Sequence, residues 1–133
     1  MLKQAAVSEH DDLARYFALV SYGDVIQELA PGDAEQKAFF RSRLQREQAA
    51  VCRLGCEYAL YQLGEPGALE RILGYLDDPD YLVRCRAVCT LAEIADEENR
   101  GRILEAVRGR REKEKAAPVR ERMDELLGRE AAE

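Results

Sequence analysis

The feature that most constrains this chain is an internal repeat with a spacing of 31 residues. Without any gap, the segment "CRLGCEYALYQLGEPGALERILGYL", which begins at Cys52, aligns with "VRCRAVCTLAEIADEENRGRILEAV", which begins at Val83. The matched positions carry apolar residues in both copies: Leu60 with Leu91, Leu63 with Ile94, Ile72 with Ile103, Leu73 with Leu104 and Leu76 with Val107. A third, partial copy begins at Val119, 36 residues after the second.

The apolar residues inside each copy recur every three or four positions, which is the spacing of one face of an α-helix. No stretch of the chain alternates between apolar and polar residues as a half-buried strand does. A repeat of this length is typical of helix pairs that stack, because one pair alone cannot bury its apolar stripe. The sequence therefore predicts an all-α fold.

The segment "DPDYLVRCRAVCTLAEIAD", residues 78–96, resembles a HEAT repeat of the short bacterial kind. The DPD turn, the Val-Arg pair, the small residue Ala87, and the apolar residues Leu91 and Ile94 carry the resemblance. It covers about residues 50–128, whereas residues 1–48 match only loosely and are interpreted as a divergent N-terminal helical cap.

The resemblance implies an α-solenoid of stacked antiparallel helix pairs, with about six to seven helices in one domain over residues 1–133. The second helix of each pair would line an inner surface. Binding of protein partners is the usual work of this family. Some relatives act in chromophore attachment to light-harvesting proteins, and others bind or repair DNA. The matched positions are structural, so the resemblance transfers no catalytic residue, and we expect a protein that is not an enzyme.

Capping and breaking residues predict the boundaries of the first helices. Ser8 is a candidate N-cap for a helix that begins near residue 10. Gly23 is predicted to interrupt that helix, and residues 24–30 are predicted to form a short second one. Asp33 and Gln36 have the spacing of a capping box that opens a third helix.

The third helix is predicted to be long, over about residues 34–63, and Gly55 is the position where the helix would be locally weakest. The "GEPG" segment at 64–67 ends it, and the "DDPD" segment at 77–80 is a turn. In that turn, Asp80 is a candidate N-cap for the next helix.

One face of the predicted helix after Asp80 is apolar without belonging to the core stripe. At about 100° per residue, Cys85 and Cys89 lie almost opposite Val83, Ala87 and Leu91. The matching residues one repeat earlier are Leu54, Tyr58 and Tyr61, and exposed apolar patches usually contact another surface. We favour burial of this face under the N-terminal helices. The alternative is a homodimer or partner surface, whose candidate residues are Leu54, Tyr58, Tyr61, Cys85 and Cys89.

The four cysteines form two C-x-x-x-C pairs, Cys52 with Cys56 and Cys85 with Cys89. Four thiolates could bind zinc or an iron–sulfur cluster, but the repeat alignment places the first pair inward and the second outward. The pairs should not converge, and we predict neither a metal site nor any other cofactor. A reactive thiol at Cys85 or Cys89, serving cofactor or chromophore attachment, is an alternative function.

A cluster of basic residues follows the second repeat. Residues 99–122 hold nine Lys or Arg against four Asp or Glu. If the family geometry holds, Arg71, Tyr75, Arg102 and Arg108 lie on the inner surface, where they are candidate partner-binding residues. We favour a solvated stretch of alternating charge for "REKEK". Weak nucleic-acid binding through these arginines is a further alternative.

Bulk properties restrict the function. The net charge of -6 disfavours nucleic acid as the main partner. No apolar run is long enough for a transmembrane helix, and no signal peptide is apparent, so we expect a cytoplasmic protein that binds no membrane. The sequence therefore predicts a non-enzymatic interaction module for a protein partner.

Overall fold

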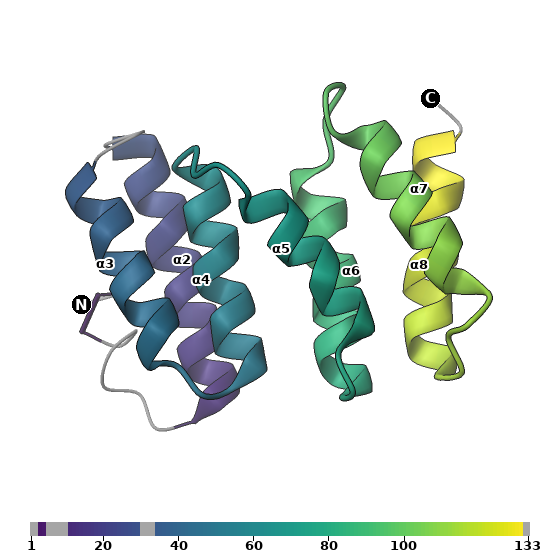
Figure 1. Cartoon of the computed structure of the whole chain (residues 1–133), viewed down its shortest axis with the longest axis horizontal. Helices are drawn as coiled ribbons and strands as arrows, with labels where there is room; N and C mark the ends of the chain where they lie inside the picture. The colour runs from purple at the N-terminus through teal and green to yellow at the C-terminus, as the bar shows by residue number, and fades with distance from the viewer. Residues whose placement is uncertain (1–2, 5–10, 30–33, 132–133) are drawn as a thin grey trace. The chain divides into compact units, whose positions relative to one another are not determined.

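The computed structural model describes residues 3–4, 11–29 and 34–131. In these ranges the structure contains helices and turns but no strand, so the prediction of an all-α chain is confirmed for them (Figure 1). The helices are α2 (Asp12–Leu29), α3 (Ala34–Arg46), α4 (Ala50–Gln62), α5 (Ala68–Gly74), the 3-10 helix η1 (Tyr75–Asp77), α6 (Tyr81–Ile94), α7 (Arg100–Arg111) and α8 (Ala117–Ala131). Ser8 and Asp33, the two predicted caps near the N-terminus, lie outside the described residues.

No helix in the described ranges combines the length and the apolar character that crossing a membrane requires.

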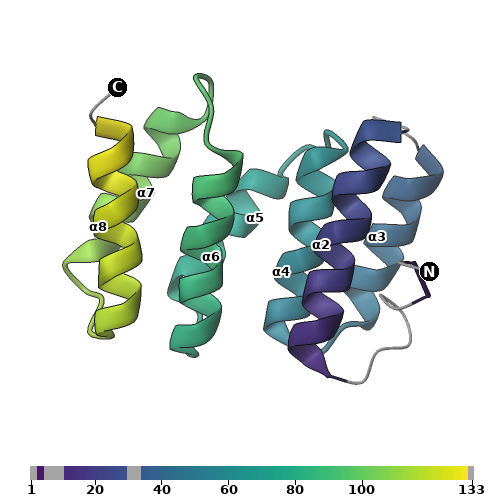
Figure 2. The same ribbon diagram turned by 180° about the vertical axis from the view of Figure 1, so that it is seen from behind.

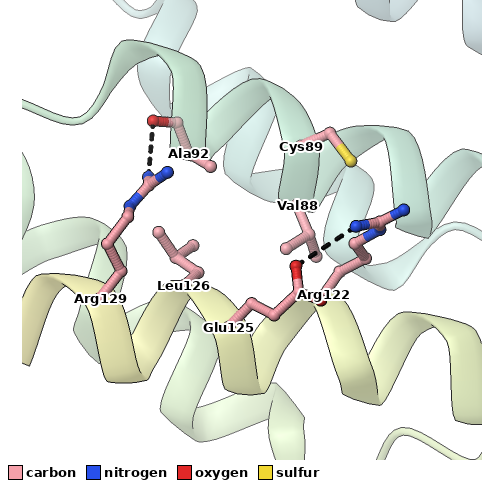
Figure 3. A pocket seen from close by; sticks show the side chains of 7 residues that line it. All are labelled: Val88, Cys89, Ala92, Arg122, Glu125, Leu126 and Arg129. Atoms are coloured by element: carbon pink, nitrogen blue, oxygen red, sulfur yellow. Dashed lines mark hydrogen bonds and ion pairs between the residues drawn. The ribbon is translucent and has the colours of Figure 1, made fainter.

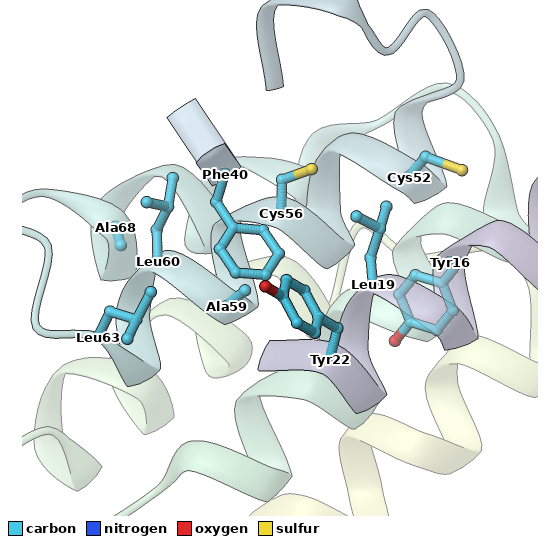
Figure 4. Packing of buried hydrophobic residues seen from close by; sticks show 10 residues of the cluster. All are labelled: Tyr16, Leu19, Tyr22, Phe40, Cys52, Cys56, Ala59, Leu60, Leu63 and Ala68. Carbon is cyan, nitrogen blue, oxygen red and sulfur yellow. The ribbon is translucent and has the colours of Figure 1, made fainter. Parts of the chain in front are cut away.

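The chain divides into two compact units, residues 1–71 and residues 72–133. In the first unit, α2 and α3 both pack against α4, and the three helices lie side by side when seen from either side (Figures 1 and 2). Their shared core is drawn in Figure 4. Its members are Tyr16, Leu19, Tyr22, Phe40, Cys52, Cys56, Ala59, Leu60, Leu63 and Ala68. Burial of such side chains is the main driving force that holds the three helices together.

Gly23 does not interrupt the first helix, because α2 runs through it from Asp12 to Leu29. The predicted break at this glycine is therefore wrong. A Cβ atom on Gly23 would lie 2.7 Å from the Cβ of Ala59 on α4. The glycine is thus required by the close approach of two helices rather than by a turn.

The predicted single helix over residues 34–63 is also wrong. The chain leaves the helical conformation at residues 47–49, between α3 and α4. Glu47, at this break, is buried. Arg15 Nε donates to both of its carboxylate oxygens, at 3.0 and 2.8 Å, and Arg43 Nη2 donates to Oε2 at 3.0 Å. The helix therefore ends where Glu47 meets two arginines from α2 and α3.

In the second unit, α6 and α7 both pack against α8. The apolar positions of the repeat are buried as predicted, with Leu91, Ile103 and Val107 fully inaccessible. The predicted cap is confirmed, because the backbone N–H of Leu82 donates to Asp80 Oδ1 at 2.9 Å. The turn from α6 to α7 is closed by Asn99, whose side chain donates to the carbonyl of Ile94 at 2.9 Å.

The same ion pair occurs once in each unit. Arg15 and Arg84 are each the fourth residue of their helices, α2 and α6. Their partners are Glu47, three residues before α4 begins at Ala50, and Glu114, three residues before α8 begins at Ala117. Arg84 Nε and Nη2 donate to Glu114 at 2.7 and 2.8 Å. We call these two pairs the arginine–glutamate clamps.

One clamp ties α2 to the turn that leads into α4, and the other ties α6 to the turn that leads into α8. The side chains of Glu47 and Glu114 are only 3% and 4% exposed. Burial by itself would raise the pKa of Glu47, but the hydrogen bonds from Arg15 and Arg43 outweigh it and hold that pKa below its usual range. The hydrogen bonds from Arg84 lower the pKa of Glu114. Both glutamates are therefore ionised at neutral pH.

Substitution of Gly23 tests the close approach of α2 and α4. Gly23→Ala should lower the free energy of unfolding by about 1 kcal/mol or more, because the cost of overpacking exceeds the helix-propensity gain of up to ~1 kcal/mol. The matched control is Gly101→Ala on α7, where a Cβ would meet nothing within 4 Å. The control should gain up to ~1 kcal/mol. Urea unfolding measures both variants, and stabilisation by Gly23→Ala would contradict the packing described here.

Substitution of Glu114 tests the second clamp. Glu114→Gln should cost about 1–3 kcal/mol at pH 7, because it replaces charge-assisted hydrogen bonds to Arg84. A carboxylate whose pKa is depressed in the folded state stabilises it above the unfolded-state pKa of about 4.3. That contribution disappears as the pH falls through the lower folded-state value. The difference between wild type and variant should therefore shrink below about pH 4.

The control for this experiment is Glu121→Gln, at an exposed position on α8. It should change the free energy of unfolding by no more than about 0.5 kcal/mol. An equal effect of Glu114→Gln at pH 3 and pH 7 would argue against an ionised Glu114 in the clamp.

Candidate interaction surface

A groove of about 430 Å³ lies between α6 and α8 in the second unit. Figure 3 shows the seven side chains that line it. They are Val88, Cys89 and Ala92 from α6, and Arg122, Glu125, Leu126 and Arg129 from α8. Val88 and Leu126 are buried and form an apolar floor, while Arg122, Glu125 and Arg129 are exposed at the rim. The lining of the groove thus combines apolar and charged side chains.

The corresponding helix pair of the first unit is closely packed. Between α2 and α4, the Tyr16 ring lies over Gly55, where a Cβ would approach the ring to 3.2 Å. By position in their helices, Cys85 corresponds to Tyr16 and Arg122 corresponds to Gly55. The second unit thus has a small side chain where the first has an aromatic ring, and an extended arginine where the first has a glycine. Of these two residues, Arg122 borders the space between α6 and α8.

The two arginines of the groove lie at its opposite ends, as Figure 3 shows. Arg122 Nη1 donates to Glu125 Oε2 at 3.2 Å, and the Glu125 side chain is 66% exposed. Arg129 Nη2 donates to the backbone carbonyl of Ala92 at 3.1 Å. The hydrogen bond to Glu125 raises the pKa of Arg122, so its guanidinium carries a full charge at any physiological pH.

The two cysteine pairs differ in burial, in the direction that the repeat alignment predicts. Cys52 and Cys56 are fully buried in the core of the first unit, and Cys52 donates its thiol hydrogen to the carbonyl of Asp12, with an S···O distance of 3.1 Å. Cys85 and Cys89 are partly exposed on α6, in the second unit. Within the described ranges, no three His, Cys, Asp or Glu side chains are grouped closely enough to hold a metal ion.

Burial controls the acidity of the thiols. It raises the pKa of Cys52 to about 11, and it raises the pKa of Cys56 still further. It also raises the pKa of Cys89, against the opposing effect of Arg122 and Arg86. A thiol with a raised pKa is mostly protonated near neutral pH, and the protonated form is a poor nucleophile. Cys89 therefore lacks the acidity expected of a reactive attachment site.

The other residues of the predicted apolar face differ from one another. Leu54 is fully buried and Tyr58 is 4% exposed, so neither presents an open surface in the folded chain. Tyr58 donates its hydroxyl hydrogen to Asp24 on α2, which confirms that an N-terminal helix covers this part of α4. Tyr61 remains partly buried. Of the predicted face, Tyr61, Cys85 and Cys89 thus stay partly accessible, and Cys89 lines the groove.

The predicted inner-face residues are divided between the two units. Arg71 belongs to the first unit, where its Nε donates to the buried Glu57 at 2.6 Å. Tyr75 is partly buried at the start of η1 in the second unit. Arg102 and Arg108 are exposed on α7, six residues apart, which separates them by about 120° around the helix axis. These two arginines do not share one face of α7.

The charged stretch "REKEK" is not simply solvated. Its Glu114 is buried in the second clamp, whereas Lys113 and Lys115 on either side are exposed. Its first residue, Arg111, is paired with Asp124, and the preceding Arg110 is paired with Asp77. The expectation of a solvated loop is thus wrong for Glu114. The sequence pattern did not show that Glu114 pairs with Arg84, which lies 30 residues earlier in the chain.

Sequence reasoning missed the residues that α8 contributes to the groove. Arg122, Leu126 and Arg129 follow one another at intervals of four and three residues, which places them on one face of the helix. That spacing could have grouped them. Nothing in the sequence shows that this face meets Cys89 of α6, however, because the pairing is set by packing.

Comparisons of the chain with protein-family models, with curated proteins and with solved structures found no match. The resemblance to HEAT repeats therefore stays an interpretation of the sequence pattern.

Thiol accessibility tests the placement of the cysteines. A disulfide reagent at pH 8 should modify Cys85 and Cys89 in the folded protein, while Cys52 and Cys56 should react only after denaturation, because both are fully buried. The reaction of Cys89 should accelerate up to a pH above the ordinary thiol pKa of about 8.5. The variants Cys85→Ala and Cys89→Ala assign the two native reactions. Modification of Cys52 on the same time scale would contradict this burial.

Proposed function

We propose that this chain is a non-enzymatic interaction module that holds a protein partner, built from stacked antiparallel helix pairs of the HEAT-like kind. The repeat at 31 residues and the recurrence of the arginine–glutamate clamp support the repeat architecture. The observation that carries the function is the α6–α8 groove. It is open and partly apolar, whereas the equivalent helices of the first unit approach each other closely at Gly23 and Gly55.

The two alternative functions have less support. Attachment of a cofactor or chromophore through Cys85 or Cys89 needs a thiolate near neutral pH, and burial raises the pKa of Cys89. Nucleic-acid binding needs a row of available cations. In the segment 99–122, however, Arg110, Arg111 and Arg122 are already paired with Asp77, Asp124 and Glu125.

A groove-filling variant tests the proposed function. Ala92→Phe places a ring in the groove, and the matched control Gly101→Phe places the same ring on the exposed surface of α7. Wild type and control should retain the same protein from a lysate of the source organism, and Ala92→Phe should lose it. The purified partner should then bind wild type at least about tenfold more tightly than Ala92→Phe in calorimetry. Circular dichroism verifies that both variants fold.

The same experiment can contradict the proposal. If no protein is retained by wild type, or if the partner binds Ala92→Phe and wild type equally, then the groove does not serve as an interaction surface.

A further inference from the structure

Two of the cysteines lie on one accessible face of α6. Cys85 and Cys89 are four residues apart in this helix, so their side chains project from the same face, with Cβ atoms about 5–6 Å apart. Both are free thiols, both are partly exposed, and Cys89 borders the α6–α8 groove. Together they offer two sulfur atoms to a ligand that arrives from solvent.

The surroundings place these thiols close to each other and to one guanidinium. Burial raises the pKa of Cys89, and the neighbouring Cys85 raises it further. Arg122 and Arg86 oppose this shift. The pKa of Arg122 is raised by Glu125 first and then by both thiols. In Figure 3 the sulfur of Cys89 points toward the Arg122 guanidinium. A negatively charged complex at the two sulfurs would therefore lie beside a cation, which keeps its present pairing with Glu125.

The helical spacing favours a bridging ion over a direct disulfide. A disulfide needs Cβ atoms about 3.5–4.5 Å apart, which is closer than positions i and i+4 of a helix bring them. An ion between two thiolates adds two bonds of about 2.3 Å, the length of a zinc–thiolate bond, so that the sulfurs lie up to about 4.6 Å apart. Side chains whose Cβ atoms are about 5–6 Å apart can reach that separation without a change in the helix.

The number and kind of ligand atoms select the ion. In the part of the chain that the structure describes, no three His, Cys, Asp or Glu side chains form a group that could hold a metal ion, so the two thiols have no third ligand of this kind. Structural zinc takes four ligands, of which this pair would supply half. Thiolates are soft ligands that suit Cu(I), zinc and iron–sulfur clusters. Of these, Cu(I) is the one that two thiolates in a line can satisfy.

We propose that Cys85 and Cys89 bind one Cu(I) ion between their sulfur atoms. Each thiol loses its proton to solvent as its sulfur binds, and no oxidant or reductant is consumed. The two thiolate charges and the single positive charge of the ion leave one negative charge on the complex. Cys52 and Cys56 have the same spacing in α4, but they are fully buried and closed to an ion from solvent. This inference concerns an ion rather than a protein partner, so it does not depend on the proposed function.

Anaerobic titration tests the site in the whole, reduced chain. Cu(I) is offered as its complex with the chelator bathocuproine disulfonate, whose colour reports how much copper the protein withdraws. Wild type should withdraw one Cu(I) per chain. Cys85→Ser and Cys89→Ser should each bind at least about hundredfold more weakly, because each removes one of two linked ligands. Circular dichroism verifies that the variants fold, and X-ray absorption of the loaded wild type should show two sulfur neighbours.

The matched control keeps the number of thiols but separates them. Cys89→Ser combined with Arg108→Cys, at an exposed position on α7, should bind Cu(I) as weakly as Cys89→Ser alone. A further measurement needs no substitution. Bound Cu(I) should slow the reaction of Cys85 and Cys89 with a disulfide reagent by at least about tenfold, because the attacking thiolates are occupied.

Several results would overturn the inference. They are the absence of copper withdrawal by wild type, full binding by the double variant Cys85→Ser, Cys89→Ser, and equal binding by the control with separated thiols. Half an ion per chain together with a dimer in size-exclusion chromatography would also overturn it, because the ion would then bridge two chains. Failure of this site leaves the partner-capture experiment with Ala92→Phe unaffected, so the two proposals are tested separately.

Discussion

A buried carboxylate in the turn before a helix is the contact on which each unit of this protein depends. Glu47 and Glu114 are both almost inaccessible, and each is bound by an arginine from the fourth position of a helix that is distant in sequence. An isolated buried carboxylate would be very costly, so its arginine must be present for the turn to form. The net gain in stability from such a pair can be small, but the geometry it demands is specific. The clamps thereby fix how α2 meets α4 and how α6 meets α8.

The same geometry leads to different surfaces in the two units. Once α2 and α4 are held together, Gly23 lets the backbones approach, and the Tyr16 ring fills the space over Gly55. Once α6 and α8 are held together, Ala92 and Cys85 take the places of Gly23 and Tyr16. The helices still pack, yet a groove remains beside Arg122. A recurring framework with altered side chains can thus pack closely at two glycines in one unit and border a groove in the other.

The sequence allowed the helical class, the repeat core and one cap to be predicted, because these features depend on residues close in the chain. The apolar spacing indicated helices, and the burial of Leu60 and Leu91 follows from it. Asp80 caps α6 because its carboxylate needs a partner only two residues away. The predicted break at Gly23 failed for the opposite reason. A glycine within a helix and a glycine that ends one look alike until the neighbouring helix is known.

The amino-acid sequence by itself thus determined that the described chain is helical and that its helices repeat, since period and capping are local properties. The tertiary structure decided where α3 ends, why α2 continues, and which helix pair leaves a groove. Each of these outcomes depends on a side chain meeting another that lies 30 or more residues away, as Arg15 meets Glu47 and Arg84 meets Glu114. Such contacts are determined by the packing of the whole unit, and the periodicity of one helix does not predict them.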